Sequence, residues 1–149
     1  MSQLNGWFSL RTPEDLLGKL EADFDRLCAA NPTSVDAQYA AFDFFVTAEH
    51  FPDWLCHTIG GSLTQHRTYP DGALVSHVAN GAKHFRVDDS RHTTVRETRL
   101  RPGAFQPNAF QPTGFDVPRL VLDLENGRSI AVMEVAKRVV DHWRSVLRP

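Results

Sequence analysis

The chain has 149 residues, of which 42% are hydrophobic and 23% are charged. Domains usually contain roughly 100 to 150 residues, so we expect one folded domain over 1–149 and exclude an intrinsically disordered chain. The sequence has no run of about 18 apolar residues that would span a membrane. Residues 1–10 also lack the basic-then-apolar order of a secretory signal. We therefore expect a cytoplasmic protein without a membrane partner.

The net charge of −2 is unevenly distributed. Residues 1–60 carry three basic and nine acidic side chains, whereas residues 61–149 carry thirteen basic and nine acidic ones. Most of the basic side chains are arginines, whose planar guanidinium group suits phosphate and carboxylate groups. The cationic part of the chain indicates either a phosphate-bearing partner or an internal surface that pairs with the acidic part.

Two helices are predicted in the first part of the chain. Thr12 and Pro13 supply a capping hydroxyl and a proline at the first helical position, so the first helix begins here and runs to about residue 30. The second helix opens over 33–36 and is expected to end before Pro52, because proline lacks a backbone donor. We expect this helix to be central, with an apolar stripe made by Val35, Tyr39, Phe42 and Val46 that Ala41, Phe44 and Phe45 widen.

The second part of the chain changes from helical to alternating periodicity. A loop over 60–70 leads to a third helix, which Asp71 is expected to cap, and residues 94–101 then predict a polar edge strand. A hairpin over 119–133 is expected to turn at Asn126-Gly127 in type I′ geometry. A last helix follows from about residue 134. The fold class is therefore α+β and mainly α: a bundle of about four main helices, with a small antiparallel sheet before the C-terminal helix.

A short repeat precedes the hairpin, as Ala104-Phe105-Gln106-Pro107-Asn108 is nearly repeated by residues 109–113. Two copies of five residues are too few for a solenoid, so we expect an extended, proline-containing arm. Such an arm would lie against the domain or clasp a protein partner. It supports one functional alternative, a non-enzymatic interaction protein of the immunity or antitoxin type.

The third helix carries the most suggestive side chains. With 100° per residue, its apolar residues lie on one face, and His77, Asn80 and His84 form a separate polar stripe. Gly81 beside this stripe costs helix stability relative to alanine and leaves room for a close approach. We therefore treat His84, Asn80 and His77 as candidate catalytic residues. The structural alternative is that these side chains hydrogen-bond loop backbone.

Residues 79–84 resemble the motif of the HEPN superfamily, in which an arginine and a polar residue are followed by three residues and a histidine. Asn80 matches the polar residue and His84 the histidine, while Ala79 stands at the arginine position. The resemblance implies a small helical protein that forms a homodimer, and many members are metal-independent ribonucleases of toxin and antiviral systems. Lys83 or Arg86 on this helix, or an arginine from elsewhere, would have to replace the missing guanidinium group.

If this chemistry is retained, His84 acts as general acid or base on a ribose 2′-hydroxyl, because imidazole titrates near neutral pH. Asn80 would then orient the phosphate or the imidazole. The resemblance thus implies a HEPN-like protein that binds RNA or another phosphate-bearing partner, including as a degenerate ribonuclease of a bacterial defence or toxin–antitoxin system. Arg99 and Arg101 lie on the same side of the predicted strand and form a cationic edge, either for binding or merely solvated.

The remaining alternative is a small metal-dependent enzyme. His50, His57, His77 and His84 would converge if the second and third helices packed antiparallel, and a carboxylate from Glu49 would complete a zinc or non-haem iron site. The sequence lacks HExxH spacing, a phosphate-cradling glycine loop and a dinucleotide fingerprint. We therefore assign no metal ligands and expect no cofactor.

Overall fold

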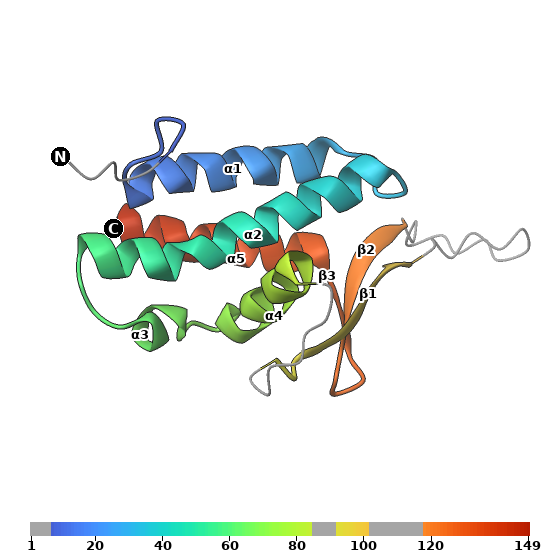
Figure 1. The fold of residues 1–149 in the computed structure, drawn as a ribbon. Coiled ribbons are helices and arrows are strands. Elements are labelled where there is room, and N and C mark those ends of the chain that lie inside the picture. The colour runs from blue at the N-terminus through green and yellow to red at the C-terminus, as the bar shows by residue number, and fades with distance from the viewer. Residues whose placement is uncertain (1–6, 85–91, 102–117) are drawn as a thin grey trace, which may run out of the picture.

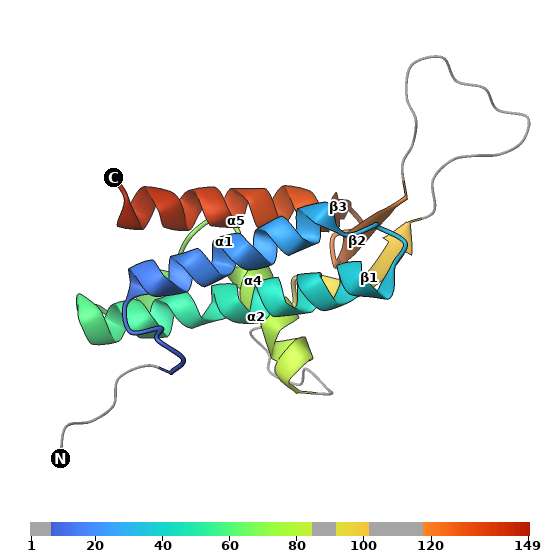
Figure 2. The ribbon, with the colours of Figure 1, turned by 90° about the horizontal axis from the view of Figure 1, so that it is seen from above.

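Three long helices form the body of the protein. The computed structural model describes residues 7–84, 92–101 and 118–149. Helices α1 (Pro13–Ala29), α2 (Val35–Thr58) and α5 (Val132–Leu147) run lengthwise beside one another, and α1 contacts both of the others (Figures 1 and 2). Within the described ranges, no helix is both long enough and apolar enough to cross a membrane.

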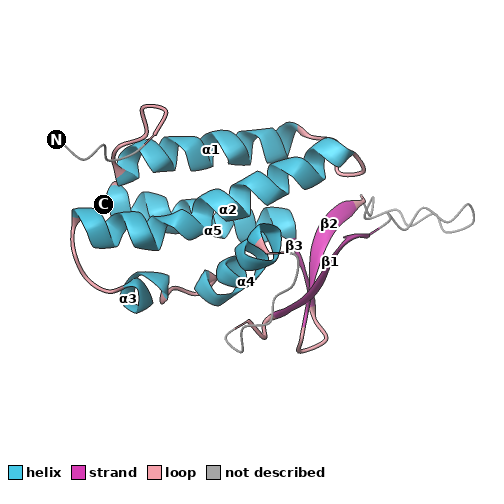
Figure 3. Cartoon of the chain, in the orientation of Figure 1, coloured by secondary structure: helices cyan, strands magenta, loops and turns pink. Residues whose placement is uncertain are grey.

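Two smaller helices and a sheet complete the fold (Figure 3). Helix α3 (Leu63–Arg67) and helix α4 (Gly72–Lys83) both pack against α2. Strands β1 (Val95–Arg101), β2 (Arg119–Leu124) and β3 (Ser129–Ala131) form an antiparallel sheet in the order β1-β2-β3. The predicted α+β, mainly helical fold class is confirmed, and β1 is an edge strand as expected. The predicted arm lies outside the described residues.

Aromatic packing holds the helices together. Phe51 of α2 stacks on the buried Trp143 of α5, with the ring centroids 4.8 Å apart. Phe44 and Phe45 are also fully buried and meet edge to face at 5.6 Å. Such pairs combine a large burial of apolar surface with favourable ring geometry. The sheet joins this core through Leu122 of β2, which is 1% exposed.

The predicted start of α1 is confirmed in atomic detail. The Thr12 hydroxyl accepts from the backbone N–H of Asp15 at 3.1 Å, and the Asp15 carboxylate accepts from the backbone N–H of Thr12 at 3.0 Å. This reciprocal pair satisfies two backbone donors that have no partner within the helix.

The predicted end of the second helix was wrong, because α2 continues through Pro52 to Thr58. Proline removes one intrahelical hydrogen bond. Here Phe51, Pro52 and Leu55 are all buried, so the packing of this last part of α2 outweighs the loss of that bond.

The buried face of α2 includes Phe44 and Phe45, which were expected to widen the apolar stripe, but not the centre of that stripe. Tyr39 is 63% exposed and Phe42 is 51% exposed, whereas Phe44, Phe45 and Ala48 face the core. Apolar residues cover most of the helix circumference, so the sequence pattern alone did not indicate which side was buried.

Two connections differ from the expectation. The segment expected to be a loop contains α3. Asp71 makes no side-chain cap to α4, because its carboxylate is paired with Arg138 of α5.

In the hairpin, Gly127 has a φ of 82° but Asn126 does not have a positive φ. The connection is therefore a tight turn followed by a left-handed glycine, the usual form of a three-residue hairpin loop, rather than type I′.

Candidate functional site

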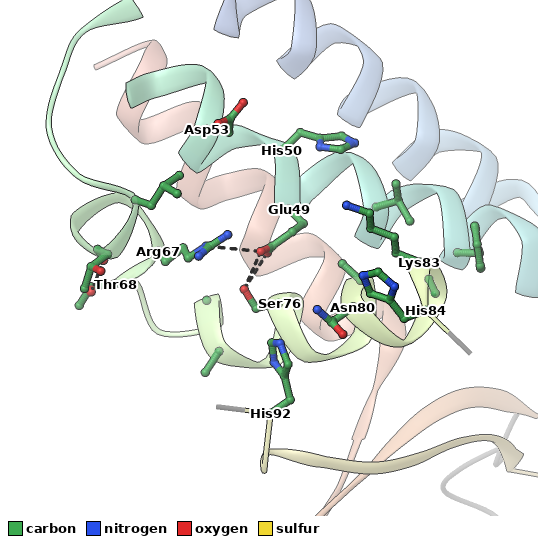
Figure 4. A pocket seen from close by; sticks show the side chains of 18 residues that line it. Glu49, His50, Asp53, Arg67, Thr68, Ser76, Asn80, Lys83, His84 and His92 are labelled. Atoms are coloured by element: carbon green, nitrogen blue, oxygen red, sulfur yellow. Dashed lines mark hydrogen bonds and ion pairs between the residues drawn. The ribbon is translucent and has the colours of Figure 1, made fainter. Parts of the chain in front are cut away.

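A pocket of about 750 Å³ lies between α2, α3 and α4. Cavities of roughly this size bind small ligands in other proteins. Its polar and charged lining side chains are labelled in Figure 4: Glu49, His50, Asp53, Arg67, Thr68, Ser76, Asn80, Lys83, His84 and His92. The pocket brings together the polar face of α4 and the exposed polar side chains in the second half of α2.

The carboxylate of Glu49 is held at the floor of this pocket. The Ser76 hydroxyl lies 2.7 and 2.8 Å from the two oxygens of Glu49, to which it donates. Nε of Arg67 lies 3.5 Å from Oε1 of Glu49, and this Nε is buried without a hydrogen-bond partner among the described residues. The charges of Glu49 and Arg67 therefore offset one another, and together with Ser76 they tie α3 and α4 to α2.

Asn80 and Lys83 of α4, together with His84, form one wall of the pocket. His84 was expected within the helix, but α4 ends at Lys83 and His84 is its C-cap with extended backbone. Lys83 and His84 are exposed at the end of the helix, where the backbone N–H of His84 donates to the carbonyl of Asn80 at 2.8 Å. Neither Lys83 nor His84 forms an ion pair with any carboxylate in the described part of the chain. Their donors and acceptors are therefore available to a ligand in the pocket.

His50 lies on the α2 side of the same pocket (Figure 4). Desolvation lowers the pKa of His50 from its usual value of 6.5, and the ammonium group of Lys83 lowers it further. The carboxylates of Glu49 and Asp53 act in the opposite direction without restoring the usual value. At neutral pH the imidazole of His50 is therefore mainly uncharged and able to accept a proton.

His92 enters the pocket from the segment before β1, although its polar surroundings in the sequence indicate a solvated residue. Its Nε2 is buried and has no hydrogen-bond partner among the described residues, and its ring lies 5.5 Å from that of His77. A buried polar atom without a partner is costly unless a ligand or water satisfies it. No feature of the sequence connects His92 to the stripe on α4.

The structure separates His77 from the other two candidates, Asn80 and His84. Its Nδ1 accepts from the backbone N–H groups of Thr94 and Val95, at 3.2 and 3.0 Å. Burial lowers the pKa of His77, and the neighbouring His92 lowers it further. His77 therefore holds the start of β1 against α4, the structural alternative that the sequence left open for this stripe.

The arginines assigned to binding lie elsewhere. Arg99 is paired with the buried Asp123 across the β1–β2 ladder, with Nη2 3.2 Å from Oδ1. The guanidinium of Arg99, followed by the hydroxyl of Ser129, lowers the pKa of Asp123 to about 2. Arg101 lies at the end of β1, opposite Arg119, and does not line the pocket. Arg86 is outside the described residues.

The histidines expected to converge do so only in part. His50 and His84 share the pocket, while His57 is exposed and lies 3.5 Å from Asp53. In the three described stretches of chain, no three histidine, cysteine, aspartate or glutamate side chains are grouped so that they could hold a metal ion.

One signal for the additional lining residues was present in the sequence. Ser76, Asn80 and Lys83 follow one another at spacings of four and three residues, so they share one helix face. The contributions from α2 and α3 depend on tertiary packing.

No protein-family model, no curated protein and no solved structure matches the chain. The chemistry of the pocket is therefore the basis for a functional proposal.

Proposed function

We propose that the protein binds RNA through a phosphate group held in the pocket between α2, α3 and α4. The observation that carries this proposal is that Asn80, Lys83 and His84 of the HEPN-like segment meet His50 of α2 in one pocket. A lysine, a carboxamide and two imidazoles are all able to donate hydrogen bonds to phosphate oxygens when the imidazoles carry the right proton.

The pocket lining holds two carboxylates, Glu49 and Asp53, and two cations, Arg67 and Lys83, so the pairing of these groups, and not an excess of positive charge, leaves Lys83 for a phosphate group. Glu49 already offsets the guanidinium of Arg67, whereas Lys83 makes no ion pair with a described carboxylate. Ala79, at the place of the motif arginine, is 4% exposed and packs inside the fold. The cation in this HEPN-like site is therefore Lys83, one turn further along the helix.

The same groups supply acid–base chemistry for metal-independent cleavage of the strand. In the proposed step, His50 takes the proton of a ribose 2′-hydroxyl, the 2′-oxygen attacks the phosphorus, and the bond from phosphorus to the 5′-oxygen breaks. Protonated His84 gives its proton to the leaving oxygen. The products are a 2′,3′-cyclic phosphate and a 5′-hydroxyl end, and neither oxidant nor metal is consumed.

The proposal extends to the properties that the resemblance implies. It describes a homodimeric, HEPN-like protein of a bacterial defence or toxin–antitoxin system. Sedimentation equilibrium of the full chain tests the dimer directly, and a monomer at all concentrations would restrict the proposal to RNA binding and cleavage.

Binding and cleavage are measured separately. Fluorescence anisotropy with a 2′-O-methyl single-stranded RNA measures binding without turnover, and gel analysis of unmodified RNA in EDTA measures cleavage. We expect Lys83→Ala to weaken binding about 10-fold, because a phosphate contact is lost. His84→Ala and His50→Ala should each reduce the cleavage rate about 100-fold or more, as loss of a general acid or base does.

Matched controls come from the same residue types outside the pocket. Lys137→Ala and His57→Ala remove an exposed lysine and an exposed histidine that line neither wall. Both should leave binding and cleavage unchanged. Equal losses in the control and pocket variants, or no detectable RNA binding by the intact protein, would overturn the proposal.

A further inference from the structure

A second pocket of about 740 Å³ adjoins the first. It lies between α2, α4 and the sheet, and two side chains, Phe42 of α2 and Ala82 of α4, line both pockets. The two cavities therefore lie on either side of the place where Phe42 faces α4. A ligand that leaves the first pocket in this direction enters the second.

Exposed aromatic rings mark the α2 side of this path. Tyr39 is 63% exposed and Phe42 is 51% exposed, and their spacing of three residues puts them on one face of the helix. Large apolar side chains that are exposed as a group indicate a surface for binding. Planar rings on such a surface stack well with nucleobases of any sequence.

The charge of the second pocket favours a polyanion. Its described lining residues include Arg96 and Arg99 but no aspartate or glutamate. Arg99 is engaged by Asp123, whereas Arg96 is exposed and only reaches Glu97 at 4.0 Å. An exposed pair at this distance contributes little to holding the guanidinium in place. Arg96 is therefore available to a phosphate.

We infer that a single-stranded RNA continues from the first pocket across Phe42 into the second. Its bases stack on Tyr39 and Phe42, and its next phosphate reaches Arg96. This inference rests on the proposed function, because it assumes a phosphate at Lys83. The ligand has to be single-stranded, since bases paired within a duplex do not offer their faces to aromatic side chains.

The other candidate occupant of an apolar helix face is a second copy of the chain. The combination of exposed rings with an arginine, and the absence of carboxylates among the described lining residues of the second pocket, favours RNA. Self-association through this face is therefore an outcome that the experiment distinguishes.

The experiment compares one nucleotide with a strand. Calorimetry with uridine 3′-phosphate reports on the first pocket alone, and anisotropy with 2′-O-methyl oligouridylates of increasing length reports on both. We expect affinity to rise with length in the unaltered protein. Tyr39→Ala should weaken oligonucleotide binding about 10-fold and leave uridine 3′-phosphate binding unchanged, because one stacked base is lost. Arg96→Gln should weaken oligonucleotide binding and reduce its salt dependence.

Phe8→Ala is the matched control, since this phenylalanine is 96% exposed and lines neither pocket. It should change neither measurement. If uridine 3′-phosphate binds but longer strands bind no more tightly, the inference is wrong while the proposed function stands. If no uridine compound binds, the proposed function fails first. If Tyr39→Ala converts a dimer into a monomer in sedimentation, the face joins two copies and the inference is overturned.

Discussion

Arg138 of α5 forms a bidentate ion pair with Asp71, with Nη2 2.7 Å from Oδ1 and Nε 3.1 Å from Oδ2. Asp71 is 8% exposed and precedes the first residue of α4, so this pair fixes the start of the helix that carries Asn80, Lys83 and His84. The arrangement of the candidate site therefore depends on an ion pair outside it.

Loss of this ion pair should destabilise the whole fold. Arg138→Ala leaves a buried carboxylate without its partner, and we expect the free energy of unfolding to fall by about 2 kcal/mol, less than for a fully buried pair because the arginine is half exposed. Urea denaturation measures the change. Lys137→Ala breaks the exposed pair with Asp141 and should cost less than about 0.5 kcal/mol. Similar losses in the two variants would show that the Asp71 contact contributes little.

His77 should contribute to stability through the start of β1. His77→Ala removes the acceptor for two backbone N–H groups, and we expect the free energy of unfolding to fall by about 1 to 2 kcal/mol. His57→Ala, an exposed histidine on α2, provides the baseline and should change stability by less than about 0.5 kcal/mol. Unaltered stability of His77→Ala would argue against a structural role.

Stability should decrease when the solution is acidified below neutrality. The pKa values of His50, His77 and His142 are all lowered in the folded protein, chiefly by desolvation, from the usual value of 6.5. The unfolded chain then binds protons first, so stability is complete above pH 6.5 and is lost as the pH falls towards the folded pKa values.

Urea midpoints measured at pH of about 7.5 and about 5.5 test this dependence. Both pH values lie above the range in which carboxylates titrate. His77→Ala should reduce the loss between the two pH values, because it removes one of the histidines whose pKa is lowered by folding. A midpoint that rises on acidification would contradict the expected sign.

Gly72 should not tolerate a side chain. A Cβ atom at this position would lie 2.0 Å from the carbonyl oxygen of Arg67, and backbone cannot yield as a flexible side chain can. We expect Gly72→Ala to destabilise the protein and to displace α3. Gly18→Ala is the opposite case, because its Cβ meets nothing within 4 Å inside α1, so helix propensity should add about 0.5 to 1 kcal/mol. Equal thermal midpoints for the two variants would contradict both expectations.

The elements that the sequence predicted best are those with local signals. Thr12 and Pro13 mark the start of α1, and alternation marks β1, because these features depend on neighbouring residues. The end of α2 depends on contacts between Phe51 and Trp143, which are 92 positions apart in the chain, and so could not be read from the segment around Pro52.

The candidate site also combines residues that local sequence patterns indicate with residues that only tertiary packing brings in. Asn80 and His84 were predicted together from helical spacing and both line the pocket, although α4 ends at Lys83 and His84 is its C-cap with extended backbone. His50 and His92 reach the pocket only through the packing of α2 and the path of the chain before β1. His77 lies on the same stripe by helical geometry, but its Nδ1 accepts a hydrogen bond from the backbone N–H of Val95 in the neighbouring strand. Helical periodicity indicates on which face of a helix a side chain lies, but it does not indicate which other element packs against that face.

Different side chains of helix α2 serve core packing and the lining of the pockets. Phe44 and Phe45 serve the interior, while Tyr39 and Phe42 line the pockets and remain largely exposed. Because Tyr39 and Phe42 are largely exposed, we expect substitutions at these two positions to cost little folding stability, so both are suited to a saturation library. Under the proposed function, a screen of such a library for altered oligonucleotide binding would separate changes in binding from changes in folding.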